Sequence, residues 1–382
     1  MIGFSWIWVL AAGCLLVSAG AEWWRWHSAA VKDAPVALKV AQPLQRSFRL
    51  SERSSATIPM PAGVPAAHAS ALAALPNGDL LACWWAGTRE SAPDVQLYAA
   101  RWHNGRWSEA RAIVERKSLG RALHMGVRRI GNPVLWVAPD GRVHLYLVAT
   151  GLGGWAAGRV AQLVSDDEGQ SFTARRLLPL TPLWNTSVLV RTRPVGLADG
   201  GWLLPAYFEL GHKYPMVISF DAQGEPRWVR RISGSVTSLQ PALLPLSGTE
   251  LRAVMRDIGA QKRVQQAESR DGGLSWQDVP ASAVVNQDSS VAALQLAGGG
   301  YVLLHNEPLP GGGSPRQWLR LSTSRDGKAW QAGPDMRRGL PGDEFSYPSL
   351  VQIGNQLHVT YTQQRRAIAH HVYDIEYEEG AK

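Results

Sequence analysis

The sequence predicts an all-β protein, a six-bladed β-propeller that follows an N-terminal signal or anchor segment. A short turn motif recurs along the chain, β-hairpins with tight turns alternate with it, and no helical periodicity of any length competes. The chain also contains 38 glycines, 24 prolines and 17 tryptophans, a composition typical of many short strands joined by turns.

The recurring motif reads Ser-x-Asp-x-Gly-x-Ser-aromatic. It has two full copies, one compressed copy and two echoes that keep only the glycine and the tryptophan: SDDEGQSF (165–172), SRDGGLSW (269–276), SRDGKAW (324–330), HNGRW (103–107) and DAQGEPRW (221–228). The final aromatic residues are 48 to 65 residues apart. A period near fifty residues indicates a repeat architecture.

Turn chemistry explains the residue types of this motif. In the copy at 269–276, the Asp271 side chain can accept hydrogen bonds from nearby backbone N–H groups, and Gly273 can adopt positive φ. Trp276 can fold back as an apolar plug. We therefore expect each copy to close one hairpin of a repeated unit.

Hairpins supply the rest of each unit. Six segments read as strand, turn of two to four residues, and strand: ALAALPNGDLLACWWAG, PVLWVAPDGRVHLYLVATG, RPVGLADGGWLLPAYFE, PALLPLSGTELRAVMRD, AALQLAGGGYVLLHNE and PSLVQIGNQLHVTYTQ. Radial closure of six four-stranded sheets hides nearly all sheet edges. A seven-bladed alternative would use residues 22–65 as part of a blade.

The N-terminal residues predict export. Residues 1–21 carry no charged side chain and end in Ala19-Gly20-Ala21, so they read as a signal peptide or a membrane anchor. Residues 22–60 read as a linker or a closing strand, and residues 61–382 as the propeller. We expect the propeller to lie outside the cytoplasm, in the periplasm, secreted or anchored to the membrane.

Charge and cysteine content limit the classes of partner and cofactor that the sequence predicts. The formal net charge is +8 and the sequence pI is about 9.7, but no run of five basic residues and no nucleic-acid motif occurs, so we expect no nucleic-acid partner. Two cysteines allow no disulfide framework, and no ligand spacing or nucleotide fingerprint predicts a metal or another cofactor. A basic mouth on the propeller would favour acidic glycans.

These motifs resemble the sialidase (neuraminidase) superfamily, in particular its bacterial exported proteins with Asp-box (BNR) repeats. The resemblance covers about residues 60–375 and implies that the boxes are structural. It also implies a site with three arginines that clamp a sugar carboxylate, an aspartate as acid/base, and a tyrosine nucleophile paired with a glutamate. The tyrosine needs that carboxylate to accept its proton.

Four positions of this sequence match that pattern by resemblance. Segment FSYPSLVQIGNQ places the nucleophile at Tyr347, PRQWLRLSTSRDG places an arginine at Arg316, AVMRD places one at Arg256, and GTRESAPDVQ places the acid/base at Asp94. Two positions depart from it. His68 stands where the family has the first arginine, and Gln240 stands where it has the glutamate, sixteen residues before Arg256.

An amide cannot accept the tyrosine proton as a carboxylate does. Another carboxylate could replace it, and the sequence does not choose among four glutamates: Glu90, Glu209, Glu307 and Glu344. Four further residues end strands and could line the same mouth: Arg193 as a substrate-binding residue, with Asn132, Tyr361 and Arg366.

The resemblance therefore implies an exported exo-glycosidase of the sialidase type that acts on a terminal, acidic sugar of a glycan. Two alternatives remain open. A propeller that has lost the base of the tyrosine would bind glycans without cleaving them. An elimination on a uronic-acid polysaccharide, with His68 or Tyr347 as base, would also use an arginine-held carboxylate.

Overall fold

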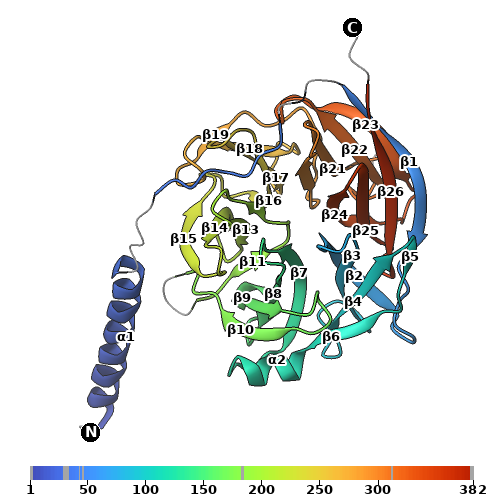
Figure 1. Cartoon of the computed structure of the whole chain (residues 1–382). Helices are drawn as coiled ribbons and strands as arrows, with labels where there is room; N and C mark the ends of the chain where they lie inside the picture. Colours follow the sequence, from blue (N-terminus) through green and yellow to red (C-terminus); the bar gives the residue numbers. More distant parts are fainter. Residues whose placement is uncertain are drawn as a thin grey trace.

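Six antiparallel sheets stand in a ring around a central axis (Figure 1). The computed structural model describes residues 3–28, 34–42, 44, 47–181, 185–310 and 313–378. Parts of the predicted signal segment, of the predicted linker and of the C-terminus lie outside these described residues. The prediction of a six-bladed β-propeller is confirmed, and the described strands do not form a seventh blade.

Each blade begins with its innermost strand and continues outward. Blade 1 contains β2 (Ala66–Ala74), β3 (Leu80–Gly87), β4 (Gln96–His103), β5 (Arg106–Trp107) and β6 (Arg111–Glu115). Blade 2 contains β7 (Arg129–Val137), β8 (Val143–Thr150), β9 (Gly158–Ser165) and β10 (Thr173–Leu177). Blade 3 contains β11 (Val188–Val190), β12 (Val195–Gly196), β13 (Trp202–Phe208), β14 (Tyr214–Phe220) and β15 (Pro226–Arg231).

The second half of the chain repeats this order. Blade 4 contains β16 (Ser238–Pro245), β17 (Leu251–Asp257), β18 (Gln265–Ser269) and β19 (Gln277–Val279). Blade 5 contains β20 (Ala292–Gln295), β21 (Tyr301–Glu307), β22 (Trp318–Ser324) and β23 (Gln331–Arg338). Blade 6 contains β24 (Phe345–Ile353), β25 (Gln356–Gln363), β26 (Ala367–Tyr377) and, as its outermost strand, β1 (Phe48–Thr57).

The pairing of β1 with β26 closes the ring. Its register runs from Phe48 opposite Tyr377 to Thr57 opposite Ala369, so strands from the two ends of the chain share one sheet. Apolar layers between neighbouring blades form the core. Trp85 and Leu97 of blade 1, for example, belong to the same buried cluster as Leu145 of blade 2.

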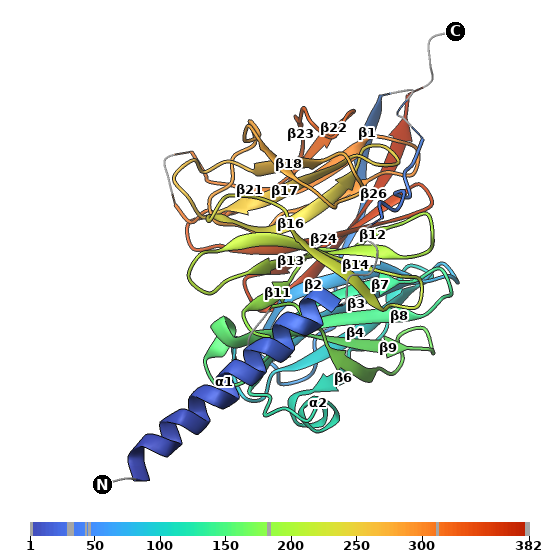
Figure 2. The same ribbon diagram turned by 90° about the vertical axis from the view of Figure 1, so that its left-hand side faces the viewer.

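Three helical segments accompany the strands: α1 (Gly3–Ser28), α2 (Arg116–Ala122) and a short 3₁₀ turn (Gly154–Ala157). Helix α1 covers most of the predicted signal or anchor segment and projects away from the propeller (Figure 2). Within the part of the chain that the structure describes, no helix is both long enough and apolar enough to cross a membrane.

The Asp-boxes have the geometry that their residue types predict. The backbone N–H groups of Gly169 and Gly273 donate to the hydroxyls of Ser165 and Ser269, at 2.7 and 2.9 Å. Both glycines have positive φ, at 81° and 96°. The aspartates Asp167 and Asp271 accept from the backbone N–H four residues later at 2.9 Å. Each full box therefore locks the turn between the two outer strands of its blade.

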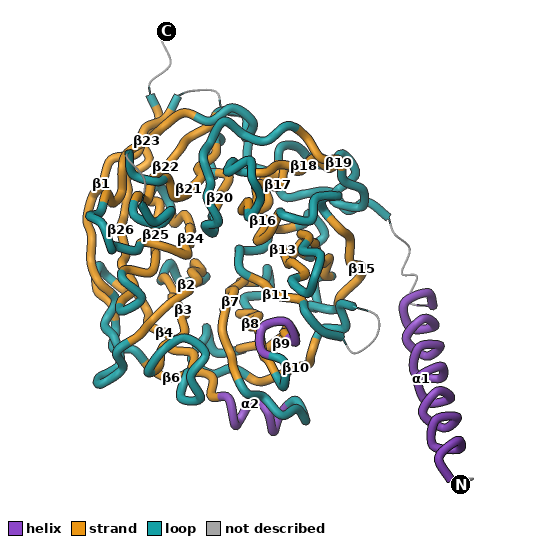
Figure 3. The backbone as a smooth tube through the Cα atoms, turned by 180° about the vertical axis from the view of Figure 1, so that it is seen from behind, coloured by secondary structure: helices purple, strands orange, loops and turns teal. Residues whose placement is uncertain are grey.

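The inner strands surround the axis (Figure 3) and share a backbone irregularity near their start. Bulges shift the pairing of β2, β7, β16 and β24 with the next strand. In each blade one residue at or just before the inner strand has positive φ: Ala69, Asn132, Ser187, Gln240, Asp288 and Tyr347. Such values are uncommon for residues other than glycine, and bulges re-aim side chains. The irregularity thus repeats at one end of the ring.

At the opposite end, residues 34–42 and 44 cross the turns that follow the inner strands. We name the described residues of this segment the strap. The N–H of Leu38 donates to the carbonyl of Gly248 at 2.8 Å, and the carbonyl of Ala37 accepts from Ala198 at 2.7 Å. The N–H of Ala41 donates to the side chain of Gln295 at 3.0 Å. The strap therefore links α1 to blades 3, 4 and 5.

We predict that Asp167→Ala destabilises the fold by about 1–3 kcal/mol, because the box loses a carboxylate that accepts several hydrogen bonds. Chemical denaturation measures this loss. Asp166→Ala is the matched control, since Asp166 is the exposed neighbour in the same turn. Equal effects of the two substitutions would contradict a structural role for the box.

The same carboxylate predicts a pH dependence. Hydrogen bonds from Ser165 and Ser171 lower the pKa of Asp167. Its contribution is therefore present above the ordinary aspartate pKa of about 3.9 and is lost as the pH falls through the lower, folded-state pKa. The destabilisation by Asp167→Ala should shrink in strong acid.

Candidate active site

Tyr347 lies at the bulge of β24, with φ of 55°, and its ring is surrounded by cations and an imidazole. The ring centroids of His68 and Tyr347 are 4.3 Å apart. The guanidinium carbons of Arg191 and Arg316 lie 5.1 and 5.6 Å from the tyrosine ring centroid. Residues that are far apart in the sequence thus meet at the end of the ring where the inner strands begin. We name this the site end.

Gln240 occupies the equivalent bulge of β16 and joins two neighbours. Its Nε2 donates to the hydroxyl of Tyr207 at 3.2 Å, and its Oε1 accepts from Nη1 of Arg256 at 3.2 Å. Asn132 also donates to the Tyr207 hydroxyl, at 3.3 Å. The amide is therefore a neutral spacer that holds Arg256 and Tyr207 in place, and it has no carboxylate with which to accept a proton.

Carboxylates at the rim orient the two matched arginines. Nε of Arg256 donates to Asp288 at 2.7 Å, and Nη1 of Arg316 donates to Glu344 at 3.1 Å. Burial disfavours the charge of Arg256, but nearby Tyr347 and the Asp288 carboxylate hold its pKa above the ordinary value. A guanidinium has five N–H donors, so both arginines keep donors for a ligand.

Arg191 is a site residue that sequence reasoning missed. It is buried, and it donates to the carbonyls of Ser70 at 3.2 Å and Pro348 at 2.8 Å. Burial lowers its pKa to about 10, so it remains a cation at neutral pH. Arg193, the residue predicted from the same segment, does not join this cluster and lines a cavity at the strap end.

Arg365 is the second missed arginine, next to the predicted Arg366, which is exposed. Arg365 donates to Glu344 at 2.8 Å and to Glu90 at 2.6 Å. Glu344 also accepts from the hydroxyl of Ser346 at 2.8 Å. Burial opposes ionisation of Glu344, but the hydrogen bonds from Arg365 and Ser346 lower its pKa overall. Glu344 is therefore a carboxylate tied to arginines.

The other predicted residues form pairs of their own. Glu307 pairs with Arg320 at 3.0 Å within blade 5, and Glu209 lies 3.7 Å from Lys213. Tyr361 is buried inside blade 6, where its hydroxyl accepts from Arg337 at 3.1 Å. None of these pairs involves Tyr347.

Asp94 lies in the loop between β3 and β4. It accepts from the N–H of Thr88 at 2.8 Å and from the Thr88 hydroxyl. This side-chain hydrogen bond lowers the pKa of Asp94, so the group is a carboxylate at neutral pH. The same loop carries Glu90, which Arg365 joins to the site. The acid/base role of Asp94 stays a prediction.

His68 is buried, and it packs edge-on against Trp85 with a centroid distance of 5.6 Å. Its Nδ1 has no hydrogen-bond partner among the described residues. Burial, followed by the charges of Arg365, Arg316 and Arg191, lowers its pKa well below 6.5. His68 is therefore a neutral imidazole and does not supply the positive charge of the arginine that it replaces by resemblance.

No group of three or more histidine, cysteine, aspartate or glutamate side chains within the described ranges could hold a metal ion. The site is instead built from a tyrosine, a neutral histidine and four arginines. Such an arrangement can bind an anion and can stabilise negative charge on a phenolic oxygen.

A six-bladed ring with Asp-boxes and a tyrosine among arginines at the start of the inner strands defines a sialidase-like β-propeller. The chain belongs to the BNR repeat-like domain family, whose model matches residues 78–359. The resemblance to the sialidase superfamily is thereby confirmed. A comparison with curated proteins gives no match.

Solved structures share the fold at low sequence identity. A sialidase from Streptococcus pneumoniae is 10% identical with a TM-score of 0.63, over 83% of this chain and 70% of that one. The intramolecular trans-sialidase of Ruminococcus gnavus is 13% identical with a TM-score of 0.61, over 84% and 96%. An α-L-arabinanase from Penicillium chrysogenum is 16% identical with a TM-score of 0.61, over 85% and 98%. These likenesses establish the fold alone.

We predict that His68 is neutral at neutral pH and titrates well below 6.5, because burial and then the charges of three arginines disfavour the imidazolium. Nitrogen-15 NMR of labelled imidazoles measures its protonation, and the His68→Gln variant assigns the signal. A titration midpoint near 6.5 would contradict the described burial.

Proposed function

We propose that the protein is a glycoside hydrolase of the sialidase type that removes a terminal, carboxylate-bearing sugar from a glycan. The observation that carries the proposal is the position of Tyr347 against His68 and between Arg191 and Arg316. We also propose that residues 1–21 direct the propeller out of the cytoplasm, with cleavage or membrane anchoring as the two possible fates of this segment.

Substrate recognition rests on the arginines. Arg256 and Arg316 are each held by one rim carboxylate and retain N–H donors that can form a planar fork with a sugar carboxylate. Arg365 adds a third guanidinium through its bonds to Glu344 and Glu90. This third cation takes over the charge that His68 lacks.

Tyr347 is the proposed nucleophile, and His68 is the proposed acceptor of its proton. As the phenolic oxygen attacks the anomeric carbon, the phenolic proton passes to the neutral imidazole and the bond to the leaving oxygen breaks. Asp94 is a carboxylate in the free protein, so it first takes up a proton from solvent and then gives that proton to the leaving oxygen. In the second step Asp94 takes a proton from the attacking water as the glycosyl–tyrosine bond breaks, and the His68 imidazolium returns its proton to the oxygen of Tyr347.

Substrate binding favours this transfer. The free site holds His68 neutral partly through the charges of Arg365, Arg316 and Arg191. A bound sugar carboxylate offsets those charges, so the imidazolium that forms is less disfavoured than in the free protein. A neutral sugar would bring no such compensation, and the site therefore favours acidic substrates.

A non-hydrolytic glycan-binding protein is the second candidate. The observation in its favour is Gln240, whose amide holds Arg256 where a carboxylate would serve as base. A uronate polysaccharide lyase remains a third possibility through His68 or Tyr347 as base. The products distinguish the three: a released sugar, no product despite binding, or an unsaturated product that absorbs in the ultraviolet.

We expect the purified full chain to hydrolyse a fluorogenic α-sialoside. Neutral aryl glycosides should be hydrolysed more slowly or not at all. Tyr347→Phe should lower turnover at least about a hundredfold, because the phenyl ring keeps the packing and removes the nucleophile. Tyr214→Phe is the matched control, since the ring of Tyr214 stacks on Phe208 and contacts the guanidinium of Arg231, neither of which belongs to the Tyr347 cluster. Full turnover by Tyr347→Phe would refute the assigned nucleophile.

We expect His68→Gln to lower kcat by about 10²–10⁴-fold with little change in KM, and added imidazole to restore part of the rate. The control is His103→Gln, because His103 is exposed and is the last residue of β4, at the strap end. An equal loss in kcat without rescue or change in the pH profile would instead indicate a packing role for His68.

A further inference from the structure

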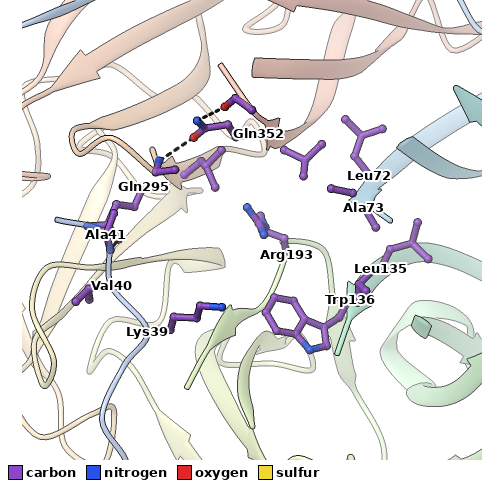
Figure 4. A pocket seen from close by; sticks show the side chains of 16 residues that line it. Lys39, Val40, Ala41, Leu72, Ala73, Leu135, Trp136, Arg193, Gln295 and Gln352 are labelled. Carbon is purple, nitrogen blue, oxygen red and sulfur yellow. Dashed lines mark hydrogen bonds between the residues drawn. The ribbon is translucent and has the colours of Figure 1, made fainter. Parts of the chain in front are cut away.

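A cavity of about 610 Å³ lies at the strap end of the inner strands (Figure 4). Its walls come from the distal parts of β2, β7, β20 and β24 and from the strap. Its lining includes Lys39, Trp136, Arg193, Gln295 and Gln352, which are labelled in Figure 4. Because Tyr347 lies at the opposite end of β24 and does not line this cavity, the cavity is separate from the candidate active site.

A break in blade 3 supplies an arginine to each end of the axis. The inner strand is interrupted between β11 and β12, and Arg191, Thr192 and Arg193 lie in the gap. The side chain of Arg191 reaches across the axis to carbonyls of blades 1 and 6, and the Thr192 hydroxyl donates to the carbonyl of Pro241 in blade 4. Arg193 points into the strap-end cavity (Figure 4).

Arg193 has no counter-ion in the part of the chain that the structure describes. No described acceptor contacts its guanidinium, and no aspartate or glutamate lines the cavity. Burial lowers its pKa to about 10, so the group is charged at neutral pH. Arg193 is half-buried, and a partly desolvated cation without a partner is stabilised when an anion joins it.

Lys39 adds a second cation to the same cavity. The strap holds its backbone in place, because the N–H of Lys39 donates to the carbonyl of Gly196 at 3.0 Å. Its side chain is exposed, and Figure 4 shows it on the same side of the cavity as Trp136. The cavity therefore carries two positive charges and no negative one from the residues that line it.

The polar amides of the cavity are already engaged. Gln295 accepts from Ala41 of the strap at 3.0 Å and donates to Tyr301 at 3.2 Å. Gln352 accepts from Ala297 at 2.8 Å and donates to Gly354 at 2.7 Å. The remaining surface is mostly apolar, from Trp136 and these side chains: Leu72, Ala73, Leu135, Leu294 and Val351. A ligand in this cavity thus meets two cations and mostly apolar walls.

We propose that this cavity binds a small organic anion that carries a carboxylate on an apolar body, with Arg193 and Lys39 on the carboxylate. The proposal does not depend on the glycosidase activity, because the two ends of the axis use different side chains. An apolar pocket with a few convergent charged groups is the usual form of such a site.

Isothermal titration of the purified full chain with hexanoate tests the proposal, with hexanol and inorganic phosphate as the uncharged and the purely polar probes. We expect hexanoate to bind at least about tenfold more tightly than either probe. Arg193→Gln should weaken hexanoate at least about tenfold, because it removes a charge-assisted hydrogen bond. Lys39→Gln, a change on the exposed strap, should weaken it less.

Arg316→Gln is the matched control, because it removes an arginine from the opposite end of the axis. Strap-end binding of hexanoate should survive in Arg316→Gln and be lost in Arg193→Gln. Loss in Arg316→Gln alone would place the ligand in the active site and overturn the proposal. Equal binding of hexanol would overturn the role of the charge, and equal binding of phosphate would overturn the apolar body. If Arg193→Gln does not fold, hexanoate binding by Arg193→Lys and by Lys39→Gln is compared with binding by Arg316→Gln in its place.

Discussion

The candidate site depends on one backbone constraint, the left-handed residue at the start of each inner strand. Tyr347, Gln240 and Asn132 sit at equivalent bulges with positive φ, a conformation that costs about 1–2 kcal/mol for residues with a Cβ atom. Proline follows each of the three, and at a bulge its missing N–H breaks no ladder hydrogen bond. The neighbouring blades of the closed ring hold these residues in this backbone conformation. In a regular strand without a bulge, these side chains would point to one or the other face of their sheet, toward a neighbouring blade, and not toward the site.

A second constraint is how the positive charges of the arginines near the axis are balanced by neighbouring groups. At the site end the arginines are balanced by Glu344, Asp288 and backbone carbonyls. Burial, and after it the charges of Arg365, Arg316 and Arg191, lower the pKa of His68 and keep it neutral, so the site combines clustered cations with an uncharged imidazole. At the strap end no carboxylate among the described residues balances Arg193. The break in blade 3 places one arginine at each end and makes the two regions differ.

Much of the fold could be predicted from the sequence because its determinants are local. The spacing of the Asp-boxes and the hairpin turns indicated six blades, and the hydrogen bonds of Asp167 and Asp271 follow from the residue types of one short turn. The meeting of His68, Gln240, Arg256, Arg316 and Tyr347 came from the resemblance to a family. Their spacing alone would not have shown it.

The remaining site residues required the structure. Arg191 was missed in favour of Arg193 because the strand break between β11 and β12 changes which residue of the segment faces the site end. Arg365 was missed in favour of Arg366 because both belong to one turn, in which Arg365 adopts positive φ and points inward. Such irregularities have no clear signal in residue type. The proline after Asn132, Gln240 and Tyr347 is a signal that could have located the bulges.

The central claim is that Tyr347 forms a covalent bond with the sugar, and mass spectrometry tests it most directly. The full chain would be incubated with a fluorinated sialosyl fluoride, which slows hydrolysis of a glycosyl–enzyme bond, and then digested. The account predicts a sugar adduct on the peptide that contains Tyr347, absent in Tyr347→Phe. An adduct on another residue, or turnover of substrate with an unmodified Tyr347 under the same conditions, would contradict it.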